Sequence, residues 1–387
     1  MTYYVRTGTV PPKRHTRAPN PLGGDLHEEL VSATGFVGPS SLLYHLRPPT
    51  GFVRIQPNRE AGVESVALDV HRRLKLRGLE PEGDYFSGRH LITSNDDMAM
   101  SALSPVEAPE QFFRNGMRDE LVVISTGTGV MQSAFGEIAF GPLDMLYIPR
   151  GTVVQWRYDE GPQNAIVIET AAPLRPPLRY RDSEGHFIEK APYYERDLHP
   201  PTLVDPVDEV GEFVVTVKIN NQTTTCILQS HPFDVVGWDG NLYPFRMNIA
   251  DFEPISGMLH QMPDTTAVFE TGKLVVCCIT PNRFEDHPDA LPQQPHHTNL
   301  DYDEIVYLLR DQKRPGQPLQ VATLHPRSMP HGPRPSPAKG PRGDRTTFYG
   351  LMIDTASPLR VHPASERFED VEYTSSWTAH AALDGRR

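Results

Sequence analysis

Short apolar runs separated by glycine and proline are the feature that most limits what this chain can fold into. Between about residues 110 and 170, β-strand-like runs at 120–125, 130–134 and 145–148 end at turns that contain Gly or Pro. The 39 prolines among 387 residues are about twice the average usage of roughly 5%. This punctuation leaves little room for long helices, and it predicts a mainly β fold built as a sandwich or barrel.

The same rhythm of strands and turns returns between about residues 272 and 355, in runs at 274–279, 304–309, 319–324 and 346–353. The repetition predicts two β-sandwiches in one chain, joined by long Pro-rich connections. We expect an N-terminal region, 1–270, that contains one sandwich at about 110–170. We expect the second sandwich, followed by a tail, in the C-terminal region, 271–387.

Charge and composition narrow the possible partners. The net charge is −12, and Lys and Arg form no stripe that would neutralise phosphates, so nucleic acid is not an expected partner. Residues 1–6 lack the apolar segment of a signal peptide, and no run approaches eighteen apolar residues. We therefore predict a cytoplasmic protein that does not bind membranes. Cys226, Cys277 and Cys278 have no zinc-type spacing and make no disulfide framework.

A candidate metal site comes from two short segments of the second half. His296 and His297 precede Glu304, which opens an apolar run, and His331 follows between two prolines and a glycine. Two imidazoles and one carboxylate are the ligand set of a mononuclear non-haem Fe(II) centre with open positions. Adjacent side chains of an extended chain diverge, so we assign His297 and leave His296 as a neighbour of the ligands. Taken singly, each residue also fits an ordinary surface histidine or a charge at a strand end.

The order of these pieces resembles the cupin β-sandwich, in which a strand starts at a ligand glutamate and a Pro-x-Gly loop follows. His297 and Glu304 match the first cupin motif, and His331 matches the second. The corresponding segments of the first half, 115–120 and 149–154, contain no histidine. There, Arg150 stands where His331 stands in its own loop, and Val154 falls where the general pattern places a histidine. We expect the first sandwich to be free of metal.

Several separated segments resemble the bacterial homogentisate 1,2-dioxygenase family. They are PPKRHT at 11–16, SSLLYH at 40–45, GWDGNLYPF at 237–245, LH at 324–325 and MPHGP at 329–333. The resemblance implies a two-sandwich (bicupin) fold, assembly into homo-hexamers and an Fe(II) site in the C-terminal sandwich. It also implies a small aromatic substrate and O₂ as partners, with homogentisate opened to maleylacetoacetate in tyrosine and phenylalanine catabolism.

The resemblance also implies roles for individual residues. The iron ligands match His297, Glu304 and His331, the catalytic histidine that accepts a phenolic proton matches His260, and a histidine beside the iron or substrate matches His325.

Two departures from the family pattern leave alternatives open. Glu304 comes seven positions after His297 where better-known members have six, so Asp303 is an alternative carboxylate ligand. Lys313 takes the place of a tyrosine that helps to hold the substrate, and we predict a substrate contact for it. Another hydroquinone-type acid such as gentisate, or a biosynthetic analogue, is the alternative substrate. A non-enzymatic metal-binding bicupin is the alternative class.

Overall fold

The computed structural model describes residues 3–13, 16, 18–32, 40–47, 52–59, 65–219, 222–257, 263–283, 299–329, 331 and 345–376. Four β-sheets contain most of the regular structure of these residues. The helical elements are short: η1 (Leu76–Gly78), η2 (Leu178–Tyr180), η3 (Glu195–Asp197), η4 (Ile249–Asp251), η5 (Pro263–Thr266), η6 (Pro363–Phe368) and α1 (Tyr373–Ser376). The predicted fold class, mainly β with two cupin-like sandwiches, is confirmed.

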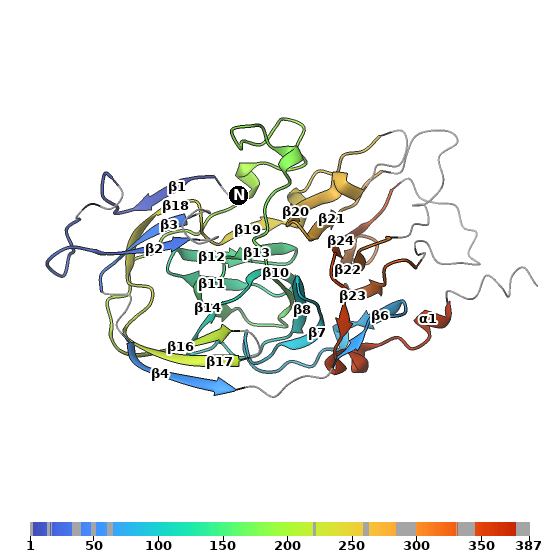
Figure 1. The fold of residues 1–387 in the computed structure, drawn as a ribbon, viewed down its shortest axis with the longest axis horizontal. Coiled ribbons are helices and arrows are strands. Elements are labelled where there is room, and N and C mark those ends of the chain that lie inside the picture. Colours follow the sequence, from blue (N-terminus) through green and yellow to red (C-terminus); the bar gives the residue numbers. More distant parts are fainter. Residues whose placement is uncertain are drawn as a thin grey trace, which may run out of the picture.

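The first sandwich consists of an eight-stranded and a seven-stranded sheet (Figure 1). The eight-stranded sheet has the order β19 (Phe245–Asn248), β13 (Asp144–Ile148), β10 (Asp119–Thr126), β15 (Asn164–Thr170), β8 (Met98–Leu103), β7 (His90–Ser94), β25 (Arg360–Val361) and β5 (Val66–Ala67). The seven-stranded sheet has the order β12 (Gly136–Phe140), β11 (Gly129–Ser133), β14 (Val153–Tyr158), β9 (Phe112–Asn115), β16 (Val210–Ile219), β17 (Gln222–Ser230) and β4 (Phe52–Arg59). The sandwich therefore extends well beyond the predicted 110–170.

Gly and Pro act at the turns, as the sequence indicated. The hairpin between β11 and β12 turns at Gly136, whose φ is +116°. A Cβ on Gly136 would lie 2.3 Å from the carbonyl oxygen of Thr202. Only glycine is compatible with both the positive φ and the nearby carbonyl oxygen. Residues with a side chain disfavour this backbone conformation, and a Cβ would clash with the oxygen.

The described part of the second sandwich is a six-stranded sheet. Its order is β20 (Ala267–Glu270), β21 (Leu274–Ile279), β24 (Phe348–Thr355), β22 (Asp303–Asp311), β23 (Pro318–His325) and β6 (Arg72–Lys75). Strand β6 lies in the chain between β5 and β7, two strands of the first sandwich, but forms the edge of this sheet, next to β23. The second sheet therefore takes strands from both sides of the expected boundary at residue 270.

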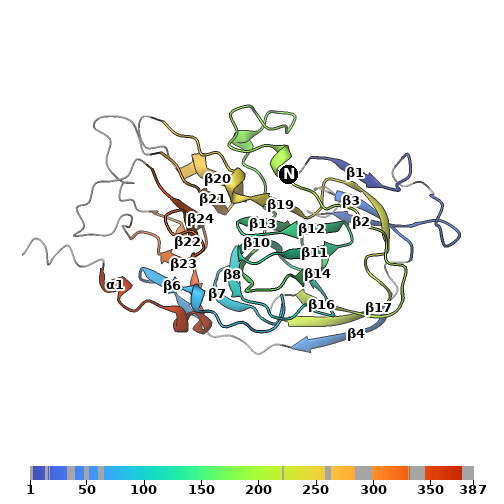
Figure 2. The same ribbon diagram turned by 180° about the vertical axis from the view of Figure 1, so that it is seen from behind.

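The two sandwiches pack through the face of the eight-stranded sheet that points away from the first sandwich's own interior. Successive residues of a strand face opposite sides. On β10, Val122 and Ile124 belong to the interior of the first sandwich, whereas Leu121 and Val123 belong to a core shared with the second sheet. Tyr307 of β22 lies in that shared core, and its hydroxyl is 2.7 Å from Ser125 Oγ. The central sheet is thus buried on both faces, and Figure 2 shows the second sheet beside it from behind.

A four-stranded sheet of β1 (Val5–Gly8), β18 (Val235–Gly240), β3 (Ser40–His45) and β2 (His27–Ser32) covers the other end of the first sandwich. The segments 40–45 and 237–245 contribute to it and have structural roles. Trp238 is fully buried, and its indole Nε1 donates to the carbonyl of Phe135 at 2.9 Å. His45 lies between Asp234 Oδ1, 2.7 Å from Nδ1, and Glu29 Oε2, 2.9 Å from Nε2.

The His45 contacts predict a loss of stability at alkaline pH. Burial lowers the pKa of His45, but hydrogen bonds to Asp234 and Glu29 outweigh burial and raise that pKa to about 9. Because the folded pKa exceeds the ordinary value near 6.5, the stabilisation is complete below pH 6.5 and is lost as the pH rises through 9. The full effect is about 3 kcal/mol. Urea unfolding of wild type and His45→Asn from pH 6 to 10 measures it.

We expect the free energy of unfolding of wild type to fall over this range relative to that of His45→Asn. His27→Asn removes an exposed imidazole from β2 and should keep the wild-type slope. Parallel curves for wild type and His45→Asn would contradict the assignment.

Candidate functional site

Glu304 lies near the start of β22, on the face that points away from the shared core. Its register partners are His325 on β23 and Asp354 on β24. Cross-strand partners share one face of a sheet, so these three polar side chains form a row inside the second sandwich. The packing determines which face of β22 carries Glu304, because Ile305 and Tyr307 fill the shared core on the opposite face.

His331 joins this row from the loop after β23. Its Nε2 atom is 3.4 Å from Glu304 Oε2, and the two side chains are only 2% and 4% exposed. Its ring stacks on that of His325, with centroids 4.5 Å apart and an angle of 17° between the planes. The other ring nitrogen, Nδ1, is 3.0 Å from the carbonyl oxygen of Met329. An Nδ1–H bond to a carbonyl is a common way to turn Nε2 toward a metal.

Asp303, the alternative carboxylate, points the other way and is held by the protein. Its Oδ1 atom accepts the Arg327 backbone N–H at 2.7 Å and the Arg327 Nε–H at 3.0 Å. Its Oδ2 atom accepts the backbone N–H of Leu359 at 2.6 Å. Asp303 therefore fixes the loop after β23, and Glu304 is the carboxylate that faces the histidines.

Three of the predicted site residues, His260, His296 and His297, lie outside the described residues. Lys313 is exposed in the turn after β22, where its backbone N–H bonds to Asp311 Oδ1. The turn follows the end of β22 opposite Glu304, roughly 25 Å away at a strand's rise per residue. The structure therefore does not bring Lys313 to the Glu304 site of the same chain.

The two sandwiches repeat the same polar plan. Arg150 bonds to Asp119 Oδ1 through its backbone N–H (3.1 Å) and Nε (2.7 Å), as Arg327 does with Asp303. Gly151 and Ser328, which follow the two arginines, both have positive φ, +84° and +59°. Arg150 is therefore the counterpart of Arg327, and its expected match with His331 is wrong.

The strand register extends this correspondence to the site itself. Glu120 pairs with Ile148 and Glu169 on its neighbouring strands, as Glu304 pairs with His325 and Asp354. Val154 follows Arg150 by four residues, as His331 follows Arg327. Val154 therefore occupies the position in the first sandwich that corresponds to His331. The first sandwich thus has apolar side chains at the positions of both His325 and His331.

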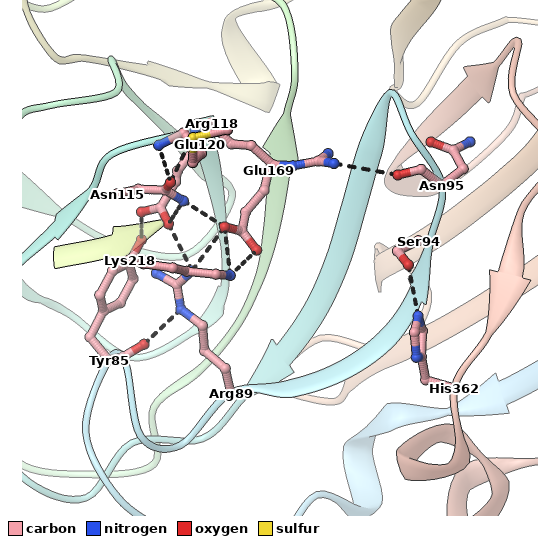
Figure 3. Close-up of polar contacts among 11 residues, drawn as sticks. Tyr85, Arg89, Ser94, Asn95, Asn115, Arg118, Glu120, Glu169, Lys218 and His362 are labelled. Atoms are coloured by element: carbon pink, nitrogen blue, oxygen red, sulfur yellow. Dashed lines mark hydrogen bonds and ion pairs between the residues drawn. The ribbon is translucent and has the colours of Figure 1, made fainter. Parts of the chain in front are cut away.

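Cationic side chains surround the counterpart carboxylates of the first sandwich (Figure 3). We call this group the first polar centre; it consists of Tyr85, Arg89, Asn115, Glu120, Glu169 and Lys218. Arg89 Nη1 lies 2.7 Å from Glu120 Oε1, and Lys218 Nζ lies 2.8 Å from Glu169 Oε2. Two carboxylates and two protein cations balance each other there.

Hydrogen bonds complete the first polar centre. Tyr85 donates its hydroxyl to Glu120 at 2.6 Å, and Asn115 Nδ2 donates to Glu120 at 3.0 Å and to Glu169 at 2.5 Å. Burial raises the pKa of Glu120, but the Arg89 charge and the hydrogen bonds outweigh it and lower that pKa. Burial, together with the Glu120 charge, raises the pKa of Tyr85 well above its usual value. The Glu120 carboxylate is therefore ionised, and its hydrogen-bond donors are protein side chains that are already in place.

The residues at Glu304 fit a metal better than their counterparts do. Two ligand atoms that each bind one ion at about 2.0–2.2 Å lie roughly 3 Å apart, close to the 3.4 Å between His331 Nε2 and Glu304 Oε2. A neutral imidazole with one carboxylate suits Fe(II). The described part of the chain holds no group of three or more His, Cys, Asp or Glu residues arranged for a metal, and His297 lies outside it.

One further histidine belongs to this site and has no signal in the sequence. His71 precedes β6 and is 5% exposed. Its Nδ1 atom is 3.3 Å from Nδ1 of His325, and its ring centroid is 6.0 Å from that of His331. We call His71, His325 and His331 the histidine cluster.

The fold and site define a bicupin in which the second sandwich carries histidines and a carboxylate and the first carries an internal ion network. The family model "Homogentisate 1,2-dioxygenase N-terminal" matches residues 8–249. A relative named "Putative dioxygenase", from Saccharolobus solfataricus, is 34% identical over 97% of this chain and 99% of its own length. Homogentisate 1,2-dioxygenase of Rhodopseudomonas palustris is 23% identical over 96% of this chain and 90% of its own length. The chain belongs to the homogentisate 1,2-dioxygenase family.

Among solved structures, a Leptotrichia buccalis protein described as a "Cupin 2 conserved barrel domain protein" is similar to 76% of this chain and 99% of its own. The TM-score is 0.29 and the identity 9%. At this score, the fold assignment rests on the strand arrangement itself. Within the residues that the structure describes, no helix has the length and apolar character needed to cross a membrane.

The first polar centre predicts a large penalty for losing its cation. Arg89→Met leaves the Glu120 carboxylate buried beside no guanidinium, and we expect the free energy of unfolding to fall by about 3–5 kcal/mol. Arg179→Met breaks a partly exposed pair with Glu270 (2.9 Å) and should cost at most about 1 kcal/mol. Urea denaturation compares the two variants. Equal losses would show that the buried pair contributes no more than a surface pair.

Proposed function

We propose that this chain is an Fe(II)-dependent dioxygenase that opens the ring of homogentisate with O₂ to give maleylacetoacetate. The observation that carries the proposal is the approach of Glu304 and His331, both buried, within the second sandwich. Family membership supports the reaction class. The contrast with the first sandwich, where Arg89 lies against the corresponding Glu120, supports a cation at Glu304.

Glu304 and His331 would hold the iron, together with His297 from outside the described residues. When bound, the ferrous ion supplies open positions at which a ring hydroxyl and O₂ meet. Met329 accepts a hydrogen bond from His331 Nδ1 and so fixes the ring with Nε2 toward Glu304. Glu304 adds a negative charge that stabilises the cation.

The remaining roles belong to the substrate. We assign to His260 the acceptance of a phenolic proton in its neutral form. We assign to His325, the cross-strand neighbour of Glu304, a contact with the iron or with the bound ring. Lys313 is not part of this chain's own substrate site. The proposal includes tyrosine and phenylalanine catabolism, a cytoplasmic location and a homo-oligomer, with a hexamer inferred from the family.

The identity of the substrate distinguishes two candidate activities of the same enzyme class. The relative that is 34% identical carries the word dioxygenase in its name and no substrate, so a gentisate-like acid is the second candidate. The Fe(II) protein should be mixed anaerobically with homogentisate, then given O₂, and the ultraviolet absorption of the ring-opened product followed. Gentisate in a parallel sample is the control. No turnover of homogentisate by iron-loaded protein would overturn the proposal.

Iron retention tests the ligand assignment. We expect Glu304→Ala and His331→Ala to lose iron and activity while they keep the fold, because each removes a ligand and little apolar contact. Asp303→Asn should retain iron and lower the melting temperature, since it weakens the bonds to Arg327 and Leu359. Metal content by mass spectrometry and thermal unfolding measure both effects. Iron loss confined to Asp303→Asn would make Asp303 the ligand.

The His260 assignment has its own test. His260→Ala should retain iron, because the residue is assigned to the substrate and not to the metal, and should lose turnover by about 10²–10⁴-fold. Metal content and kcat are measured on the same preparation. Normal turnover would remove His260 from the mechanism. A wild-type protein that binds zinc in a closed four-ligand site and turns over neither acid would favour a non-enzymatic bicupin.

A further inference from the structure

We propose that His71 is a positioning residue of this site, which holds the ring of His325 in one orientation and one tautomer. The inference rests on the proposed function for its kinetic consequences and on geometry alone for the position of the ring. His71 lies at the edge of the second sheet, on the same face as His325. It is brought there by the segment that connects β5 and β7, two strands of the first sandwich.

The strand register places His71 beside His325. Strand β6 runs antiparallel to β23, with Arg72 opposite Leu324. The next residue of each strand, His71 and His325, therefore come together at the end of the ladder. Their ring centroids are 5.2 Å apart and the planes are inclined by 57°. His325 thus contacts both the stacked ring of His331 and the Nδ1 atom of His71.

The contact between the two Nδ1 atoms has a chemical consequence. A neutral imidazole carries one N–H, so at a distance of 3.3 Å one ring must donate and the other must accept. The second nitrogen of His325, Nε2, is 3.1 Å from Thr323 Oγ1. In neutral His325, the position of the single N–H proton therefore determines which ring nitrogen donates to its partner and which accepts. His71 couples its own tautomer to that of His325.

The backbone of His71 is itself fixed by the C-terminal segment. Thr374 of α1 donates its hydroxyl to the carbonyl of His71 at 2.7 Å. The next residue, Arg72, makes two bonds to Glu369, of 2.9 and 3.1 Å. Lys75 at the end of β6 pairs with Asp370 at 3.0 Å. These contacts hold β6 against the sheet and so define where the His71 ring lies.

Three substitutions separate positioning from simple packing. The side-chain amide of Asn lies close to the Nδ1 position of histidine, that of Gln lies close to Nε2, and Leu has neither. We expect His71→Leu and His71→Gln to lower kcat by about tenfold or more with unchanged iron content, as loss of an orienting partner does. His71→Asn should retain kcat within about threefold, because it keeps a polar atom near His325 Nδ1.

The matched control is His362→Leu. His362 is a buried histidine of the first sandwich, and its Nε2 atom is 2.7 Å from Ser94 Oγ (Figure 3). Its loss should lower the melting temperature without changing kcat or KM. Wild-type kcat and KM in His71→Leu would overturn the proposal. Equal losses of kcat in all three His71 variants and in the control would also overturn it, because they would report packing alone.

Crystal structures of the iron-loaded variants give a readout that needs no turnover. We expect the His325 ring to be rotated or split between orientations in His71→Leu and His71→Gln, and to be unchanged in His71→Asn. An unmoved His325 ring in all three variants would overturn the positioning role, whatever the substrate. If wild type does not open homogentisate, the proposed function fails, and the crystal structures still decide the role of His71.

Discussion

The burial of one sheet on both faces is the constraint on which the rest of the molecule depends. Strand β10 contributes Val122 to the interior of its own sandwich and Leu121 to the core shared with the second sheet. Because side chains alternate along a strand, packing the shared core settles which residues face inward. Glu120 and Glu304 point into their own sandwiches because their neighbours Leu121 and Ile305 are needed at the interface. The polar chemistry of both sandwiches is thus fixed by an apolar contact.

The two sandwiches use the same inward-facing carboxylate in different ways. In the first, Arg89 and Lys218 supply the positive charge from the protein itself. In the second, Glu304 lies beside imidazoles, which are neutral ligands when unprotonated. A buried carboxylate needs compensation, since isolated charges in the interior are costly. In the proposed metal site, imidazoles stand beside the carboxylate where the first sandwich has permanent side-chain cations.

Much of this fold was predictable from the sequence, and less of the site. Gly and Pro punctuation located β10, β13 and β22 because turns and strands are local features. The proximity of Glu304 and His331 followed from motif spacing. The choice between Asp303 and Glu304 did not, because adjacent strand residues face opposite sides and only the packing of Ile305 sets the phase. The sequence comparison matched Arg150 with His331, whereas its structural counterpart is Arg327. The loop sequences do not reveal that Arg150 bonds to Asp119 as Arg327 bonds to Asp303. His71 had no local signal at all.

The position of β6 has a consequence for how the chain reaches its native state. Lys75 pairs with Val321, so this edge of the second sheet joins residues roughly 250 positions apart, and such closures are slow. During synthesis β6 must wait for its partner strand, because β23 leaves the ribosome much later. The second sheet is therefore the late-folding part of the molecule. A truncated product that ends before residue 321 would leave β6 without its partner strand, as an exposed edge open to aggregation.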